Sequence, residues 1–191
     1  MSKHGVQRVF QVIHITALSL WLGAVGMSGI VAATVFPSMG RMQPTLGAYP
    51  EYEGDHALLA AGQIAGKVFL IVDSIQFGAA AIALGSLVTM LIAGYSLNTI
   101  PRVLRVIVLM ATMGLLSWHL FMLMPGMSED LVRYWDFAQA GDTEQADIHK
   151  NNFMSLHETA ANSLKGLTFG TVLCLILAVW TAIGAQPKNA E

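Results

Sequence analysis

The sequence predicts an all-α integral membrane protein, a four-transmembrane-helix bundle with an interfacial helix in an outer loop. Of its 191 residues, 54% are hydrophobic and 12% are charged, whereas a soluble domain has about 25% charged residues. Four stretches contain no Asp, Glu, Lys or Arg: 9–40, 74–101, 106–128 and 166–187. Each stretch exceeds the roughly 20 apolar residues that a helix needs to cross a bilayer.

The apolar stretches predict helices rather than barrel strands, because they are continuous and show no strict alternation. We expect Pro37 to end the first helix, Asn98 to Pro101 to form the turn before the third, and Pro125-Gly126 to close the third. The whole chain, 1–191, is then a single membrane domain. Its four helices are expected at about 8–35, 60–96, 103–125 and 155–185.

Two outer loops are expected, at 36–59 and 126–154. The second contains an apolar and aromatic cluster flanked by acids, which is typical of an interfacial helix at headgroup level; its members are Leu131, Val132, Tyr134, Trp135 and Phe137. Asp142 is a suitable N-cap for a polar helix that begins at Thr143. This helix can run directly into the fourth membrane helix.

Lys and Arg in the short flanks predict the orientation in the membrane. With the amino terminus inside, the cytoplasmic segments hold Lys3, Arg8, Arg102, Arg105 and Lys188, against Arg41, Arg133 and Lys150 outside. Most acids fall in the two outer loops. We therefore expect both termini in the cytoplasm and an integral protein of a bacterial inner (cytoplasmic) membrane.

Composition and motifs exclude several other classes of protein. A net charge of −2 and a pI near 6.3 provide no basic surface for nucleic acid. The single cysteine, Cys174, rules out an intrachain disulfide. The sequence has no P-loop or GxSxG motif, and His157-Glu158 lacks the second histidine of a zinc-protease motif. The expectation is a protein that is not an enzyme.

Several polar side chains lie inside the predicted helices, where charges are costly and usually face a partner or a cavity. Their spacing along the helices predicts an outward-facing polar pocket, lined by Asp73, Gln76, His119, Asn162, Lys165 and Lys67, with His157 and Glu158 at its mouth. Asp73 and Lys165 would form an ion pair. The alternative is structural pairing within the bundle, with the lysines extending to the headgroups.

Three histidines on the predicted outer side, His56, His149 and His157, are candidate metal ligands near several methionines. Imidazole and thioether groups suit copper, and imidazole with carboxylate suits zinc. The competing interpretation is that the methionines fill apolar gaps, since the sequence has no HxxxH or CxxC spacing. A haem between two histidines is not favoured, because His14 and His119 would differ in depth by about 12 Å.

Four segments resemble one family of membrane domains: RVFQVIHITALSLWLG (8–23), VFPSM (35–39), HALLAAGQIAGKVF (56–69) and NNFMSLHETAANSLKG (151–166). The matching residues are His14, Trp21 and Gly23 in the first segment, Gly62, Gln63, Lys67 and Phe69 in the third, and Phe153 and His157 in the last. In these patterns the chain resembles the transmembrane protein 205-like family. The resemblance implies a multi-pass four-helix protein without established catalytic activity. Some relatives are linked to resistance against metal-based drugs.

The leading hypothesis is a non-enzymatic membrane protein whose polar pocket handles a small solute or a soft metal ion. The second is an accessory subunit of a larger membrane complex, because Gly and Ala on the first two helices allow close helix approach. The same small residues would also suit packing within the chain or a homo-oligomer. A haem-binding electron-transfer protein is the third hypothesis.

Overall fold

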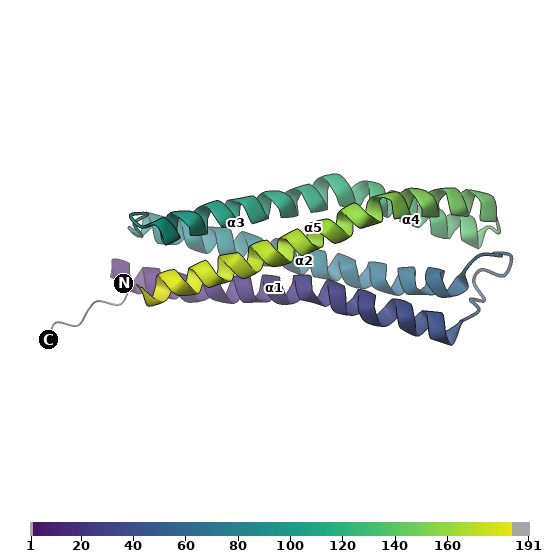
Figure 1. The fold of residues 1–191 in the computed structure, drawn as a ribbon, viewed down its shortest axis with the longest axis horizontal. Helices are drawn as coiled ribbons and strands as arrows, with labels where there is room; N and C mark the ends of the chain where they lie inside the picture. Colours follow the sequence, from purple (N-terminus) through teal and green to yellow (C-terminus); the bar gives the residue numbers. More distant parts are fainter. Residues whose placement is uncertain (1, 185–191) are drawn as a thin grey trace. The chain divides into compact units, whose positions relative to one another are not determined.

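The computed structural model describes residues 2–184, and all its regular elements are helical (Figure 1). They are α1 (Lys3–Met42), α2 (His56–Ile92), α3 (Ile100–Trp118), the π-helical turn η1 (His119–Leu123), α4 (Met124–Gln139) and α5 (Thr143–Ile183). Since α3, η1 and α4 follow one another without a break, the chain has four long helices in this range. Each is long and apolar enough to cross a membrane, so the predicted all-α class and four spans are confirmed.

The first helix does not end at Pro37, and this prediction was wrong. Pro37 lies inside α1, which continues to Met42. A proline removes one backbone donor and disturbs one carbonyl, but the following residues still form helical bonds, as when Gln43 N–H donates to Met39 O at 3.0 Å. The helix ends where Gln43 adopts a left-handed conformation with φ 44°, a common way to terminate a helix.

Pro125 and Gly126 do not close the third helix either. The proline ring would clash with the carbonyl four residues earlier in a regular α-helix. The chain relieves this with the wider turn η1, in which Met124 N–H donates to His119 O, five residues back. Helical structure then continues through α4, so most of the predicted loop 126–154 is helical.

The predicted cap of the last helix is confirmed. Asp142 Oδ1 accepts a hydrogen bond from Gln145 N–H at 3.1 Å, at the start of α5. This helix runs without a break from Thr143 to Ile183, so the polar segment does continue into the fourth span. Lys188, one of the residues in the orientation prediction, lies outside the described residues.

The chain divides into two compact units, and each of the four long helices contributes to both. The first comprises 1–25, 74–116 and 166–191, and we call it the basic unit because its sequence holds five Lys and Arg but only one acid, Glu191. The second comprises 26–73 and 117–165, and we call it the acidic unit because it holds the other eleven Asp and Glu.

Neutral polar bonds join the helices of the basic unit. Gln7 Nε2 donates to Ala93 O, and Gln11 Nε2 donates to Ala178 O, both at 3.0 Å. The start of α1 is thereby tied to the end of α2 and the end of α5. The basic unit also has an apolar core of fully buried side chains, among them Leu18, Trp21, Leu87, Leu109 and Leu167.

The acidic unit has an aromatic core built from the segment before α2, from α2 itself, and from α4 and α5. Its buried members are Tyr49, Tyr52, Leu59, Tyr134, Ala138 and Ala146. Leu131, Trp135 and Phe137, which the sequence placed at the headgroups, pack against this core. Trp135 also lies over Gly66, where an added Cβ would meet its ring at 3.4 Å. An interfacial location for this segment stays a prediction.

Candidate functional site

The most unusual side chain of the basic unit is Arg105 on α3, which is only 1% exposed. Its Nη1 donates to Gln11 Oε1 at 2.9 Å, to Thr181 Oγ1 at 3.2 Å and to the Tyr95 hydroxyl at 3.4 Å. These partners come from α1, from α5 and from the turn between α2 and α3. The guanidinium also lies 5.6 Å from the centroid of the Tyr95 ring. All three hydrogen-bond acceptors are neutral.

The burial of Arg105 follows from its position on α3. Arg105, Leu109, Thr112 and Leu116 are the buried residues of this helix, and a spacing of four, seven and eleven residues places them on one face. Sequence reasoning grouped Arg105 with Arg102 at the edge of the membrane and missed this site. The periodic spacing from Leu109 and Leu116 is the signal that could have found it.

Two nitrogens of this guanidinium, Nε and Nη2, are buried and have no hydrogen-bond partner among residues 2–184. A guanidinium is planar and presents its donors as a rigid fork, which matches the oxygens of a carboxylate or phosphate in a bidentate way. The unused edge of Arg105 is therefore chemically suited to an oxyanion.

The described part of the basic unit offers no carboxylate to neutralise Arg105. Between residues 2 and 184, the basic unit contains no Asp or Glu at all. Removing a cation from water without a counter-ion costs several kcal/mol even after relaxation, and buried charges are normally paired. Such a cation calls for an anion from outside the unit.

His14 on α1 adds a second polar group with an unused atom. It is 1% exposed, and its Nδ1 lies 2.8 Å from Ala83 O and 3.1 Å from Ser86 Oγ. Ser86 Oγ itself donates to Ala83 O at 2.8 Å. His14 Nε2 is buried without a hydrogen-bond partner in the described part of the chain. His14 is three residues from Gln11, so both lie on the same face of α1.

The residues of the predicted polar pocket are spread over several environments. Gln76 is fully buried in the basic unit, whereas the other lining residues belong to the acidic unit. There Lys67 is exposed and Asp73 is half-buried, both on α2. On α5, the exposed Lys165 donates to Asn162 Oδ1 of the same helix at 3.0 Å. His157 and Glu158 are exposed on α5.

His119, another predicted pocket residue, has a buried bond to a different helix. It begins the π-helical turn and is 2% exposed. Its Nδ1 lies 2.6 Å from Ser163 Oγ of α5, and Ser163 in turn donates to Ala160 O. This arrangement joins η1 to α5 through neutral groups.

The three candidate metal ligands have three separate sets of partners. His56 donates from Nε2 to Tyr52 O at 2.9 Å and accepts from Leu46 N–H at 3.1 Å, so both its nitrogens are used. His149 bonds to Asp130 and stacks on Phe137, and the His157 ring lies beside Phe153. Across residues 2–184, no three His, Cys, Asp or Glu side chains are grouped to hold a metal. Metal handling has no support there.

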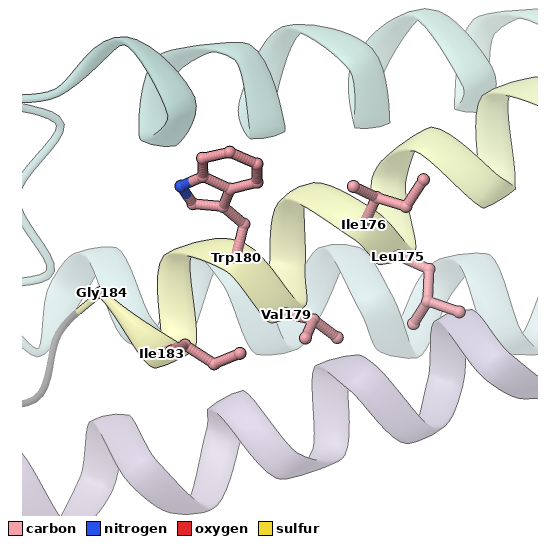
Figure 2. Close-up of a pocket in the computed structure, with 6 residues that line it drawn as sticks. All are labelled: Leu175, Ile176, Val179, Trp180, Ile183 and Gly184. Carbon is pink, nitrogen blue, oxygen red and sulfur yellow. The ribbon is translucent and has the colours of Figure 1, made fainter.

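An open apolar groove of about 550 Å³ follows α5 in the basic unit. Figure 2 shows that all its lining residues come from this helix, with Leu175, Val179 and Ile183 pointing to one side and Trp180 to the other. Apart from the indole N–H, these side chains have no polar atom. A surface of this kind suits lipid acyl chains and offers little to recognise a polar ligand.

Comparisons with known proteins give no family: no family model, no curated protein and no solved structure matches the chain. The chain is thus described by its own geometry, as a multi-pass membrane protein with four apolar helices. The resemblance to the transmembrane protein 205-like family stays a prediction.

Proposed function

We propose that the chain is a non-enzymatic membrane protein that binds a small anion at Arg105 in the basic unit. One observation carries this proposal: a fully buried guanidinium keeps two nitrogens unpartnered where the described residues of its unit include no carboxylate. A purely structural arginine would be replaced at little cost by an apolar residue of similar volume, because uncompensated buried charge is destabilising. Anion binding would explain why a charged side chain is buried at this position.

The proposed orientation places this site near the cytoplasmic face of a bacterial inner membrane. Lys3, Arg8 and Arg102 flank the apolar spans on the side of the basic unit, which agrees with the excess of Lys and Arg in cytoplasmic loops. Arg105 is five residues from the start of α3, or about 7.5 Å along the helix axis. A water-soluble anion would therefore enter from the cytoplasm.

The test measures whether anions stabilise the purified protein through Arg105. The full chain in mild detergent is unfolded thermally, with tryptophan fluorescence as the signal, in potassium chloride, nitrate or hydrogencarbonate. Potassium HEPES, a salt with a bulky anion, holds the ionic strength constant. A bound anion at a hundredfold excess over its Kd should stabilise the folded state by about 2–3 kcal/mol.

Two variants assign this stabilisation to the site. R105Q should lose the anion-dependent rise in Tm, because it removes the charge and the fork. R102Q is the matched control, since Arg102 lies three residues earlier on α3 and donates to Ser96 and Asn98 of the adjoining turn; it should respond like the parent protein. An anion response that survives in R105Q, or no response in the parent protein, would overturn the proposal.

The residues of the predicted polar pocket that lie in the acidic unit are retained as a second place for a small solute. The buried bond between His119 and Ser163 and the exposed Asn162–Lys165 pair provide the polar groups of α5 there. H119F should then weaken solute-dependent stabilisation without altering the response that depends on Arg105. If H119F left every solute response intact, this second site would be discarded.

A role as an accessory subunit is the second candidate function, and three glycines of α1 favour it. A Cβ added at Gly23, Gly26 or Gly29 would meet nothing within 4 Å among the described residues, whereas Gly170 is covered closely by Thr112. Small residues left uncovered on a membrane helix allow another helix to approach. Copurification of a partner or second copy, lost in G26L, would support this function; a monomer in mild detergent would contradict it.

A further inference from the structure

We infer that the anion bound at Arg105 is a small oxyanion carrying a hydroxyl group, of the size and chemistry of hydrogencarbonate, and that His14 Nε2 selects it by accepting a hydrogen bond from that hydroxyl. This inference rests on the proposed function and adds a specificity-determining residue to it. Three buried atoms carry it: Arg105 Nε, Arg105 Nη2 and His14 Nε2, none of which has a partner among residues 2–184.

The two guanidinium nitrogens define the donor side of the site. Each carries an N–H, and neither can accept a hydrogen bond. They call for two acceptor oxygens on one planar group, which an oxyanion provides and a monatomic halide does not. Because Arg105 is 1% exposed, a ligand that reaches this edge must also be small.

His14 Nε2 defines an acceptor, and its partners on α2 explain why. Ala83 O can only accept, so the Nδ1 that lies 2.8 Å away must carry a hydrogen and donate it. A second proton on Nε2 would place a second positive charge beside Arg105, in a unit without carboxylates between residues 2 and 184. The imidazole is therefore neutral, and Nε2 presents a lone pair that needs a donor.

Gln11 relates the two residues through α1. Gln11, which accepts from Arg105, lies three residues before His14 on the same face of α1, or about 4.5 Å away along the axis. The guanidinium and the imidazole interact electrostatically. The elements around them contribute only neutral partners: Ser86 from α2, Tyr95 from the following turn and Thr181 from α5.

The pattern of two donors and one acceptor distinguishes between anions. Nitrate and hydrogencarbonate are both planar, singly charged and of similar size, but only hydrogencarbonate has an O–H to donate. With nitrate bound, His14 Nε2 would stay buried and unsatisfied, which weakens binding. We therefore expect hydrogencarbonate to bind about tenfold or more tightly than nitrate.

The experiment titrates the full chain in mild detergent with each salt at pH 7.5, in sealed cells to retain carbon dioxide. The Kd values come from the shift in thermal midpoint at constant ionic strength. The parent protein should prefer hydrogencarbonate about tenfold, and H14F should reduce this ratio to near one by weakening hydrogencarbonate alone. H14N, which can still donate to Ala83 O, should also reduce the ratio to near one. H4F is the control, because His4 is an exposed histidine of α1, and it should leave the ratio unchanged.

The outcomes separate this inference from the proposed function. If nitrate and hydrogencarbonate bind equally well and both depend on Arg105, the selectivity assigned to His14 is wrong and the anion site stands. If no anion binds in an Arg105-dependent manner, the proposed function is wrong and the inference fails with it. Should both His14 variants fail to fold, the ratio measured on the parent protein decides the question by itself.

Discussion

The basic unit and the acidic unit are made from successive segments of the same four helices, but they treat charge in opposite ways. In the acidic unit, ion pairs join Arg133 to Glu129 and Lys150 to Asp147, and His149 is hydrogen-bonded to Asp130. In the basic unit, the one fully buried charge, Arg105, has only neutral partners. Among the described residues, charges are thus paired with opposite charges in the acidic unit, whereas Arg105 is buried with neutral partners in the basic unit.

The histidines show the same contrast. In the acidic unit, His56 uses both nitrogens in backbone bonds, and His149 is held by Asp130 and stacked on Phe137. In the basic unit, His14 is anchored at Nδ1 and keeps Nε2 unpartnered among the described residues. A histidine whose two ring nitrogens are both hydrogen-bonded can position neighbouring groups. A histidine with one buried ring nitrogen that has no partner can accept a hydrogen bond from a ligand.

The largest expected effect compares the cores of the two units. Leu59 and Leu109 are both fully buried, but Leu59 lies in an aromatic cluster whose Tyr49 and Tyr52 come from the segment 43–55, which also carries three acids. L59A should lower the free energy of unfolding by about 3 kcal/mol, because it removes both the favourable transfer of the side chain from water and its packing contacts. L109A should lower the free energy of unfolding by about half as much. It removes mainly packing contacts, because lipid tails are as apolar as the core.

Unfolding by SDS titration in mixed micelles, followed by circular dichroism, measures both free energies. I64A is the control for L59A and I107A is the control for L109A, because Ile64 and Ile107 are exposed. Each control substitution should change the free energy of unfolding only slightly. A cost for L109A equal to that of L59A would show that the two cores meet the same solvent.

A second prediction places a carboxylate in the basic unit and so removes the difference in charge pairing between the two units. Q11E would replace the amide oxygen that accepts from Arg105 Nη1 at 2.9 Å with a counter-ion. In anion-free buffer it should stabilise the protein by about 1 kcal/mol, because the gain from pairing two charges exceeds the cost of losing the hydrogen bond from Gln11 Nε2 to Ala178 O. It should also abolish the stabilisation by added anions. Thermal unfolding with and without hydrogencarbonate measures both effects.

Q11L is the control for this second prediction, since it removes the same amide without adding charge. It should be slightly destabilised and should keep its response to anions. A Q11E protein that is still stabilised by anions would mean that Arg105 does not bind them.

A third prediction weakens the best-sheltered pair of the acidic unit. Asp130 bonds to His149 at 2.8 Å, and their side chains are 21% and 13% exposed. D130N retains a hydrogen-bonding group but loses the negative charge, so the free energy of unfolding should fall by about 1 kcal/mol. SDS unfolding measures the change. The anion response of the basic unit should be unaltered, and a change in it would argue against treating the units separately.

The smallest effect is expected at the Arg133–Glu129 pair on α4. Its side chains are 55% and 64% exposed, and exposed pairs spaced by four residues contribute about 0.3–0.5 kcal/mol. E129Q should therefore change the free energy of unfolding by no more than this amount. A loss as large as that of D130N would show that the pair is better shielded from water than its exposure indicates.

The fold was predictable where the signal is local or averaged over many residues. Charge-free stretches identified all four spans, and Asp142 was correctly expected to cap the last helix. The errors lie at Pro37 and Pro125, where a helix was expected to stop. A proline removes only one hydrogen bond, and a continuing helix or a π-helical turn can absorb this loss.

The candidate site was predicted less well. Sequence reasoning emphasised polar residues deep inside the spans, such as Asp73 and Lys165, and treated Arg105 as a flanking charge. Which flanking arginine turns inward depends on the packing of four helices around it. Arg102 contacts the turn while Arg105 meets Gln11, Tyr95 and Thr181, and a difference of three residues cannot be resolved by a hydropathy window.

By itself, the sequence determined the number of spans, their apolar character and the segments in which the acids gather. These properties follow from the cost of placing charges and unpaired backbone in hydrocarbon, a cost that each residue brings wherever it packs. Only the tertiary structure decided that Arg105 lacks a counter-ion and that His14 Nε2 lacks a partner among the described residues. Whether a buried polar atom is satisfied depends on atoms from distant segments at hydrogen-bond distance, and folding alone brings these atoms together.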